Sequence, residues 1–178
     1  MTDPPPFVRT LAAQDYDHPW DGLLTRFKFH EALDLAESLA GLLLDAARRD
    51  EVHPGTLLVP MALTRARLRA RGYNQSWELT RRLGPELGCL TEARLLRRIK
   101  DGPAQASLPL ERRARNVAAA FVVDPARLGL LRDRHVTLVD DVMTTGATAA
   151  EAARTLLAAG AGRVDVWVVA RTPRPGDR

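Results

Sequence analysis

The chain of 178 residues contains one cysteine, Cys89, which excludes an internal disulfide and a zinc site built from several cysteines. We expect Cys89 to have a packing role. Only two lysines are present, Lys28 and Lys100, and because neither follows a glycine the chain contains no phosphate loop of the G-x-x-x-x-G-K type. A dinucleotide-binding fingerprint is also absent, since no third glycine completes Gly160-Ala-Gly162. Two common nucleotide-binding loops are thereby excluded.

Long hydrophobic runs are missing as well. No window approaches the run of about 18 or more apolar residues that a membrane span needs, and the first six residues, MTDPPP, lack the basic and apolar regions of a signal peptide. We therefore expect a cytoplasmic protein with no membrane insertion. The length suits one domain with a sizeable core. We expect a flexible N-terminal arm over residues 1–15, one domain over 16–172 and a C-terminal tail over 173–178.

Aromatic residues make up 5% of the chain and hydrophobic residues 46%, so the core must be built mainly from aliphatic side chains. Apolar residues at helical spacing predict helices over residues 31–49, 76–87, 110–120 and 147–159. Short apolar runs predict strands over residues 56–60, 94–100, 121–123, 136–139 and 163–170. This alternation predicts a three-layer α/β fold, in which a mostly parallel sheet carries helices on both faces.

The net charge of +4 is unevenly distributed along the chain. Residues 65–115 contain 13 basic and five acidic residues, whereas the remainder carries a net negative charge. This asymmetry predicts an electropositive region suited to a polyanion, such as pyrophosphate or a nucleic-acid backbone. Alternatively, the basic residues reflect a general preference for arginine, since all but two of the 26 basic residues are arginine. In that case many of them are solvated surface residues without a ligand.

The segment Val136–Thr148, with the sequence VTLVDDVMTTGAT, couples an apolar strand to an acidic pair. Ligands of open α/β sheets gather beyond the carboxyl ends of strands, which is where we expect Asp140 and Asp141 to lie. Successive strand side chains point to opposite faces, so both carboxylates meet one ligand only if the backbone turns between them. Carboxylates accept hydrogen bonds without donating them and therefore suit the vicinal hydroxyls of a sugar.

Thr144, Thr145, Gly146 and Thr148 follow directly, at the start of the alanine-rich helix expected over 147–159. Free N–H groups at a helix start, threonine hydroxyls and a glycine that allows close approach together form a cradle for one phosphate group. A simpler alternative is an N-capped helix after a strand, with Thr144 or Thr145 as the cap. Capping accounts for one threonine but not for the two aspartates and Thr148. The segment therefore predicts a sugar-phosphate site.

The segment resembles the phosphoribosyl-pyrophosphate-binding motif of the type I phosphoribosyltransferases. The resemblance implies that Asp140 and Asp141 bind the ribose hydroxyls. It also implies a loop that binds the 5′-phosphate, formed by Met143, Thr144, Thr145, Gly146, Ala147 and Thr148. Mg2+ would be recruited chiefly by the ligand's own pyrophosphate and hydroxyls, because this ion keeps its waters and takes few carboxylates. Asp140 and Asp141 are the candidate protein ligands of that ion.

Two further motifs resemble those of the ComF competence family, whose domain is similar to the type I phosphoribosyltransferases. The first is Arg71-Gly-Tyr-Asn-Gln75. The second consists of Gln105, Leu108, Arg113 and Asn116, ending in Ala120-Phe121. The resemblance covers roughly residues 20–172. It implies a cytoplasmic protein of natural transformation that handles incoming single-stranded DNA and retains a phosphoribosyl-pyrophosphate pocket.

By the same resemblance, the loop after the first predicted strand binds pyrophosphate, which places Met61, Ala62 and Arg71 near that group. Arginine offers a planar fork to phosphate oxygens. A surface arginine that anchors its own turn is an equal alternative for Arg71. The mobile hood loop of these folds, which closes over the ligand, corresponds in order to a segment with Gln105, Arg113 and Asn116.

The chain departs from the family in one respect. ComF proteins commonly begin with a four-cysteine zinc finger, which one cysteine cannot form, so we expect no zinc. The resemblance also leaves the reaction open and assigns no catalytic residue. One alternative is an active phosphoribosyltransferase of nucleotide metabolism with a nucleobase or amine acceptor, and another is a regulatory protein that uses the ligand as an effector. Protein partners in DNA uptake or recombination, and a homodimer, are also left open.

Overall fold

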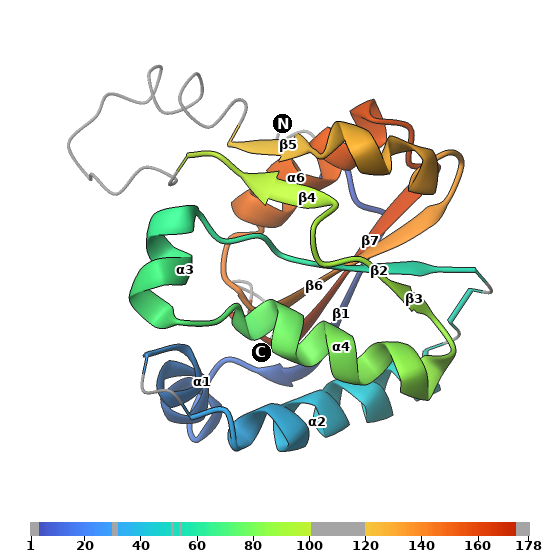
Figure 1. Cartoon of the computed structure of the whole chain (residues 1–178). Coiled ribbons are helices and arrows are strands. Elements are labelled where there is room, and N and C mark those ends of the chain that lie inside the picture. Colours follow the sequence, from blue (N-terminus) through green and yellow to red (C-terminus); the bar gives the residue numbers. More distant parts are fainter. Residues whose placement is uncertain (1–3, 30–31, 51, 54, 101–119, 174–178) are drawn as a thin grey trace.

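A parallel sheet of five strands forms the centre of the molecule (Figure 1). The computed structural model describes residues 4–29, 32–50, 52–53, 55–100 and 120–173. The strands lie in the order β1 (Arg9–Asp15), β7 (Arg163–Arg171), β6 (His135–Met143), β2 (Leu57–Pro60) and β3 (Leu90–Thr91). Every neighbouring pair is parallel, so the carboxyl ends of the strands share one edge of the sheet.

Helices cover both faces of this sheet (Figure 1). One face packs against α1 (Trp20–Phe29), α2 (Leu35–Arg49) and α4 (Gln75–Leu87). The other packs against α6 (Ala147–Ala158) and the antiparallel pair β4 (Leu96–Arg98) and β5 (Phe121–Val123). The remaining described elements are α3 (Arg65–Arg71) and the 3-10 helix η1 (Pro125–Leu130). The predicted three-layer α/β fold with a parallel sheet is confirmed.

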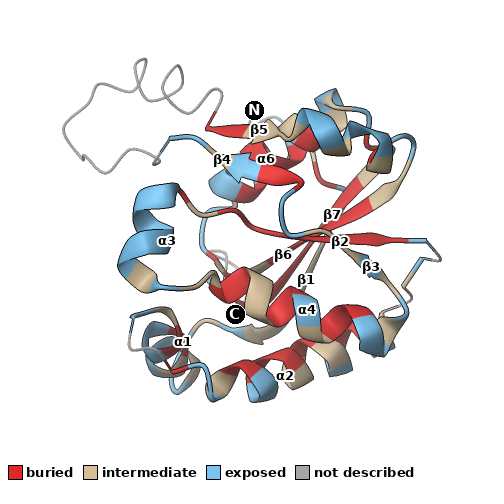
Figure 2. Ribbon diagram, in the orientation of Figure 1, coloured by how far each residue is buried: buried red, intermediate tan, exposed pale blue. Residues whose placement is uncertain are grey.

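The central strands are buried on both faces because a layer of helices lies on each side. Along β7, Val164, Val166 and Val168 belong to the cluster that packs on α6, whereas Trp167 and Val169 belong to the cluster under α2 and α4. The same alternation with a period of two runs through β2 and through β6 as far as Val139. Beyond the acidic pair it is reversed, since Val142 belongs to the cluster under α2 and α4 and Met143 to the cluster on α6. Figure 2 shows the result as a buried sheet between helices whose outer faces are exposed.

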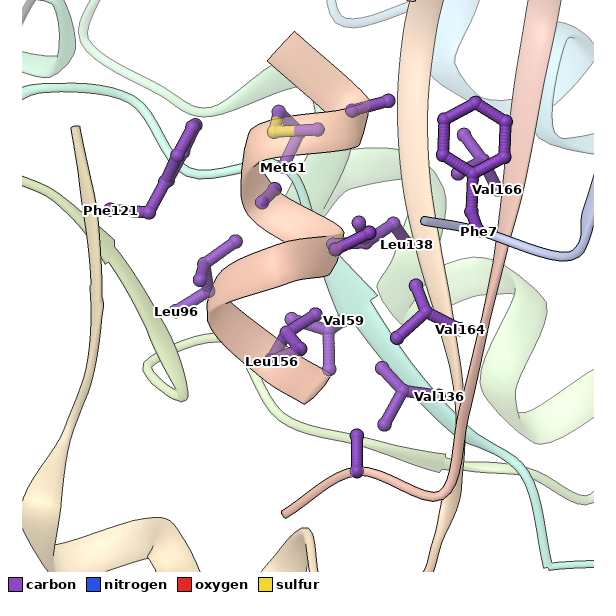
Figure 3. Packing of buried hydrophobic residues seen from close by; sticks show 14 of the residues in the cluster. Phe7, Val59, Met61, Leu96, Phe121, Val136, Leu138, Leu156, Val164 and Val166 are labelled. Atoms are coloured by element: carbon purple, nitrogen blue, oxygen red, sulfur yellow. The ribbon is translucent and has the colours of Figure 1, made fainter. Parts of the chain in front are cut away.

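The cluster around α6 is built almost entirely from aliphatic side chains, as the low aromatic content requires. Figure 3 shows Leu156 of α6 among side chains from three strands, including Val59, Leu138 and Val164. All four are less than 2% exposed. This packing fixes α6 against the sheet and thereby fixes where the turn between β6 and α6 lies.

The structure differs from the expected arm over residues 1–15. Residues 9–15 form the edge strand β1, which pairs with β7. The pairing begins with Arg9 opposite Asp165 and ends with Asp15 opposite Arg171. Phe7 lies in the core with 8% of its surface exposed. The strand is held by backbone hydrogen bonds to β7 and its burial is partial, so its sequence shows no clear apolar alternation.

Other boundaries differ by a few residues. The helix expected from residue 31 begins at Leu35, and the two-residue strand β3 and the helix α3 were not predicted. The strand expected to stop at the acidic pair continues to Met143, because β7 is equally long and pairs with β6 up to Arg171. None of the helices in the described ranges is long and apolar enough to cross a membrane.

Candidate functional site

A cavity of about 600 Å³ opens at the carboxyl edge of the sheet. Its floor is the end of β6 with the acidic pair, and one wall is the turn between β6 and α6. The opposite walls come from α1, the loop after β2, α3 and β4 through Lys28, Phe29, Met61, Leu63, Arg67, Arg71 and Arg98. The structure therefore brings together the acidic pair, the hydroxyl-rich turn and Arg71, as the sequence predicted.

Both members of the acidic pair line this cavity. Oδ1 of Asp140 accepts hydrogen bonds from the Ser76 hydroxyl at 2.8 Å and from the N–H of Asp141 at 2.9 Å. The Asp141 side chain is 2% exposed, and its Oδ2 atom lies 3.1 Å from Nζ of Lys28. Oδ1 of Asp141 accepts from the N–H of Val142 at 3.0 Å. Each carboxylate is thus held in place by its own donor.

Two carboxylates this close in a low-dielectric site cannot ionise independently. Burial, followed by repulsion from Asp141, raises the pKa of Asp140 to about 7, against the opposing effects of Ser76 and Lys28. Lys28 forms its ion pair with Asp141, the other carboxylate of the pair. The free site therefore contains one carboxyl group, that of Asp140, whose pKa lies near neutral pH.

This arrangement predicts a pH-dependent effect of Asp140→Asn on the ligand-free protein. A carboxyl whose folded pKa is about 7, above its ordinary 3.8, contributes stability at low pH that is lost as pH rises through that window. Asparagine carries no charge, so the variant should gain about 3–4 kcal/mol in free energy of unfolding, relative to wild type, between about pH 4 and pH 8.

Urea unfolding across this pH range measures the difference. Asp45→Asn on the exposed face of α2 is the matched control and should show no comparable trend. A difference between Asp140→Asn and wild type that stays constant with pH would contradict the proposed charge state of the pair.

The turn after β6 supplies the second half of the site. Gly146 has φ +78° and is the N-cap position of α6, with no capping side chain. The side chains of Thr144, Thr145 and Thr148 are exposed, whereas Met143 is buried beneath them. The hydroxyl of Thr145 accepts a hydrogen bond of 3.4 Å from the N–H of Ala147. Gly146 therefore occupies the N-cap position expected for Thr144 or Thr145, although Thr145 accepts a hydrogen bond from the first N–H of α6.

The geometry instead favours an anion cradle. The first N–H groups of an α-helix have no intrahelical acceptor, and the positive end of the helix dipole points at the same place. Here α6 has 12 residues, its first turn carries no acidic residue, and three threonine hydroxyls surround its start. Such a helix start can hold a dianionic phosphate at the wall of the cavity that faces the acidic pair.

The residues expected near pyrophosphate are only partly confirmed as cavity residues. Met61 and Arg71 line the cavity, but Ala62 lines a neighbouring groove. The Arg71 guanidinium donates to Oε1 of Gln75 and lies 5.0 Å from the ring centre of Phe29. Burial lowers the pKa of Arg71, with Asp141 opposing the shift. Arg71 thus anchors its own turn and also lines the cavity, and its contact with pyrophosphate stays a prediction.

The Arg71–Gln75 motif also braces the site. Gly72, with φ +81°, ends α3 in the left-handed conformation, and the Tyr73 hydroxyl donates to the carbonyl of Phe27 in α1. The Asn74 side chain accepts from the N–H groups of Ser76 and Trp77, which caps α4, and donates to the carbonyl of Met61 at 3.0 Å. One short motif therefore ties α1, α4 and the loop after β2 together.

Asn74→Ala should lower the free energy of unfolding by about 2 kcal/mol, because it removes a helix cap and a bond to a loop carbonyl. Asn74→Ser keeps a capping oxygen but loses the amide donor, so about half of the loss is expected to remain. Urea unfolding compares the two variants with wild type. Equal losses for serine and alanine would show that the cap contributes nothing measurable.

Sequence reasoning missed several cavity residues. Lys28, which lines the cavity, and Ser76, which lies next to it, hold the acidic pair from distant positions in the sequence. Phe29, Arg67 and Arg98 also line the cavity. The one signal in the sequence that could have indicated these residues was Lys28 itself, because almost all other basic residues of the chain are arginine. The expected hood-loop residues Gln105, Arg113 and Asn116 lie outside the described residues.

Comparison with solved structures shows the fold. The chain aligns with glutamine phosphoribosylpyrophosphate amidotransferase from B. subtilis with a TM-score of 0.53 and 17% identity, over 82% of this chain and 30% of that chain. The structure of an allosteric regulatory enzyme of purine biosynthesis gives a TM-score of 0.51 at 16% identity, over the same shares of the two chains. At this identity the likeness establishes the type I phosphoribosyltransferase-like fold.

Comparison with characterised sequences shows the family, although no family model matches the chain. DNA utilization protein YhgH of Salmonella typhi is 37% identical over 176 residues, which are 97% of this chain and 76% of that protein. YhgH of Escherichia coli K12 is 36% identical over equal shares. Competence protein F of Haemophilus influenzae is 30% identical over 94% of this chain and 74% of that protein. The chain therefore belongs to the family of YhgH and competence protein F, as its ComF-like motifs predicted.

Proposed function

We propose that the protein binds phosphoribosyl pyrophosphate with Mg2+ at the carboxyl edge of its sheet and handles single-stranded DNA as a competence-type protein. The observation that carries this proposal is that one cavity is lined both by the acidic pair and by the turn at the start of α6, which suits a phosphate. A sugar phosphate has a diol at one end and a phosphate at the other, so its diol matches the acidic pair and its phosphate matches the turn. The names of the relatives, DNA utilization protein and competence protein, support the DNA half.

In this proposal the chain's residues bind and orient the ligand. Asp140 and Asp141 accept hydrogen bonds from the ribose hydroxyls, and Lys28 and Ser76 keep the two carboxylates in place. The turn from Thr144 to Thr148 donates its N–H and hydroxyl groups to the 5′-phosphate. Arg71 lies where it can pair with pyrophosphate oxygens, for which its planar guanidinium is suited.

The donor set suits Mg2+ only as part of a ligand complex. No group of three or more metal-binding side chains occurs among the described residues, and the cavity supplies just the acidic pair. Mg2+ accepts one or two carboxylates and completes its octahedron with phosphate oxygens and water. When bound with the ligand, it would neutralise the pyrophosphate charge. Asp141 Oδ2 is buried 3.1 Å from Nζ of Lys28 and accepts no hydrogen bond of standard geometry, so it has lone pairs left that could take part in holding the ion.

A thermal shift assay tests the ligand half. A ligand that binds only the folded chain adds about 2.7 kcal/mol of stability at 100 times its dissociation constant. Phosphoribosyl pyrophosphate with Mg2+ should raise the melting temperature more than inorganic pyrophosphate with Mg2+. Only the former has the ribose hydroxyls and the 5′-phosphate that bind to the acidic pair and to the turn. An equal rise in melting temperature with both ligands would show that the ribose phosphate contributes nothing to binding and would contradict the proposed sugar site.

A salt titration tests the DNA half. Affinity for a labelled single strand should fall as salt rises, with a logarithmic slope of about −0.7 for each phosphate contact. Absence of binding even at low salt would exclude direct handling of DNA by this chain, and would leave DNA-uptake or recombination proteins as the partners through which it acts.

A second candidate function is phosphoribosyl transfer to a nucleobase or amine. The observation that favours it is Phe29, a 64% exposed aromatic ring in the cavity lining with Arg71 beside it, which offers a flat face to a planar acceptor. Pyrophosphate release is assayed across nucleobases and ammonia, with Asp140→Asn as the control. Release that depends on one acceptor and is lost in the variant would establish the enzyme, and no release with any acceptor would leave a binding protein.

A further inference from the structure

A second hollow, of about 830 Å³, lies beside the sugar-phosphate cavity, between α3 and β4. We call it the α3–β4 groove. Its lining includes Arg65, Leu68, Arg94, Arg97, Arg98 and Ile99. Leu63 and Arg98 line both this groove and the cavity with the acidic pair, so the two hollows adjoin. A polymer lying in the groove would therefore lead into the cavity.

The groove is strongly cationic. Four arginines line it against one acidic residue, Asp124, whose carboxylate is already paired with Arg127. Arg65, Arg94 and Arg97 are exposed and form no ion pair with any described residue. On α4, by contrast, Arg81 and Arg82 are both paired with Glu78. Cationic side chains held next to one another without counterions attract a polyanion.

Exposed apolar side chains distinguish this groove from a plain basic patch. Leu68 of α3 is 43% exposed, and Ile99, directly after β4, is 53% exposed. Bases of a single strand are unstacked and can lie on such side chains and on guanidinium planes, whereas a duplex hides its base faces. Alternating charge and apolar surface therefore suits a single strand better than a duplex.

We propose that the α3–β4 groove is the surface that binds single-stranded DNA, with Arg65, Arg94 and Arg97 on the phosphates and Leu68 and Ile99 against the bases. This inference rests on the DNA half of the proposed function and assigns it a place. Arg98 lies between the strand and the sugar-phosphate cavity, so DNA and metabolite are bound side by side.

The test is fluorescence anisotropy of a labelled single-stranded oligonucleotide with the full chain. The triple variant Arg65→Gln/Arg94→Gln/Arg97→Gln should bind at least tenfold more weakly, and its salt slope should be smaller by about 2, the value for three lost phosphate contacts. The matched control is Arg49→Gln/Arg132→Gln/Arg154→Gln. These three arginines are also exposed and form no ion pair with described residues, but they line neither hollow. The control should bind within about twofold of wild type.

The outcomes separate the groove from the wider function. Weaker binding in the groove variant alone, with unchanged melting temperature and unchanged phosphoribosyl-pyrophosphate binding, supports the assignment. Equal losses in both triple variants would overturn the groove while leaving DNA binding as a general charge effect. No binding by wild type would overturn the DNA half itself. Displacement of the DNA by an acidic peptide or by RNA, at lower concentration than unlabelled DNA needs, would reassign the partner.

Discussion

Asp141→Asn is expected to weaken phosphoribosyl-pyrophosphate binding by about 10- to 100-fold, because hydrogen bonds to a charged acceptor contribute about 1.5–3 kcal/mol. The substitution preserves shape: an asparagine Oδ1 can still accept from the N–H of Val142. It removes the charge that faces Lys28 and replaces an acceptor with a donor. Lys28 is 27% exposed, so its ammonium group can remain solvated and the fold should survive.

Calorimetric titration measures this effect, with Asp45→Asn as the matched control. Asp45 is an exposed carboxylate of α2 that lines neither hollow. The control should bind within about twofold of wild type. An Asp141→Asn protein with wild-type affinity would show that the acidic pair does not bind the sugar.

Gly146→Val is expected to abolish 5′-phosphate binding and to cost about 1–2 kcal/mol of stability. Gly146 has φ +78°, which a β-branched residue does not tolerate without strain. A Cβ there would make ordinary contacts, 3.4 Å from Sδ of Met143 and 3.8 Å from Cζ of Phe7, so the strain comes from φ, and the turn would move to relieve it. Displacement of two N–H donors from a phosphate loses a further 3–6 kcal/mol of binding, which is more than a hundredfold.

Gly55→Val separates strain from ligand binding. Gly55 has φ +77°, almost the same as Gly146, and its Cβ position is open. It lies before β2, at the amino edge of the sheet and away from the cavity. We expect a similar loss of stability in urea unfolding but wild-type affinity for the ligand. Equal loss of binding in both valine variants would mean that the turn has no specific part in the site.

The site was predictable to the extent that its chemistry is local. Asp140, Asp141 and the turn to Thr148 form one uninterrupted segment, so a strand, an acidic pair and a helix start could be inferred from residue types alone. Elements with a clear apolar period, such as α2 and α6, were likewise predicted within a few residues.

What could not be predicted depends on contacts between distant segments. Lys28 reaches Asp141, and Ser76 reaches Asp140, across 113 and 64 positions respectively. The strand β1 carries little apolar signal because its backbone pairing with β7 holds it in the sheet. The extension of β6 beyond the acidic pair is set by the length of β7, which local propensity does not report.

The central claim is that the acidic pair and the turn bind one sugar phosphate together. The most direct measurement is calorimetry of the wild-type chain with phosphoribosyl pyrophosphate in the presence of Mg2+. We predict saturable binding of one ligand per chain with a dissociation constant below about 1 mM, weakened when Mg2+ is removed and in both Asp141→Asn and Gly146→Val. No detectable binding at millimolar ligand would contradict the account and leave the fold without its ligand.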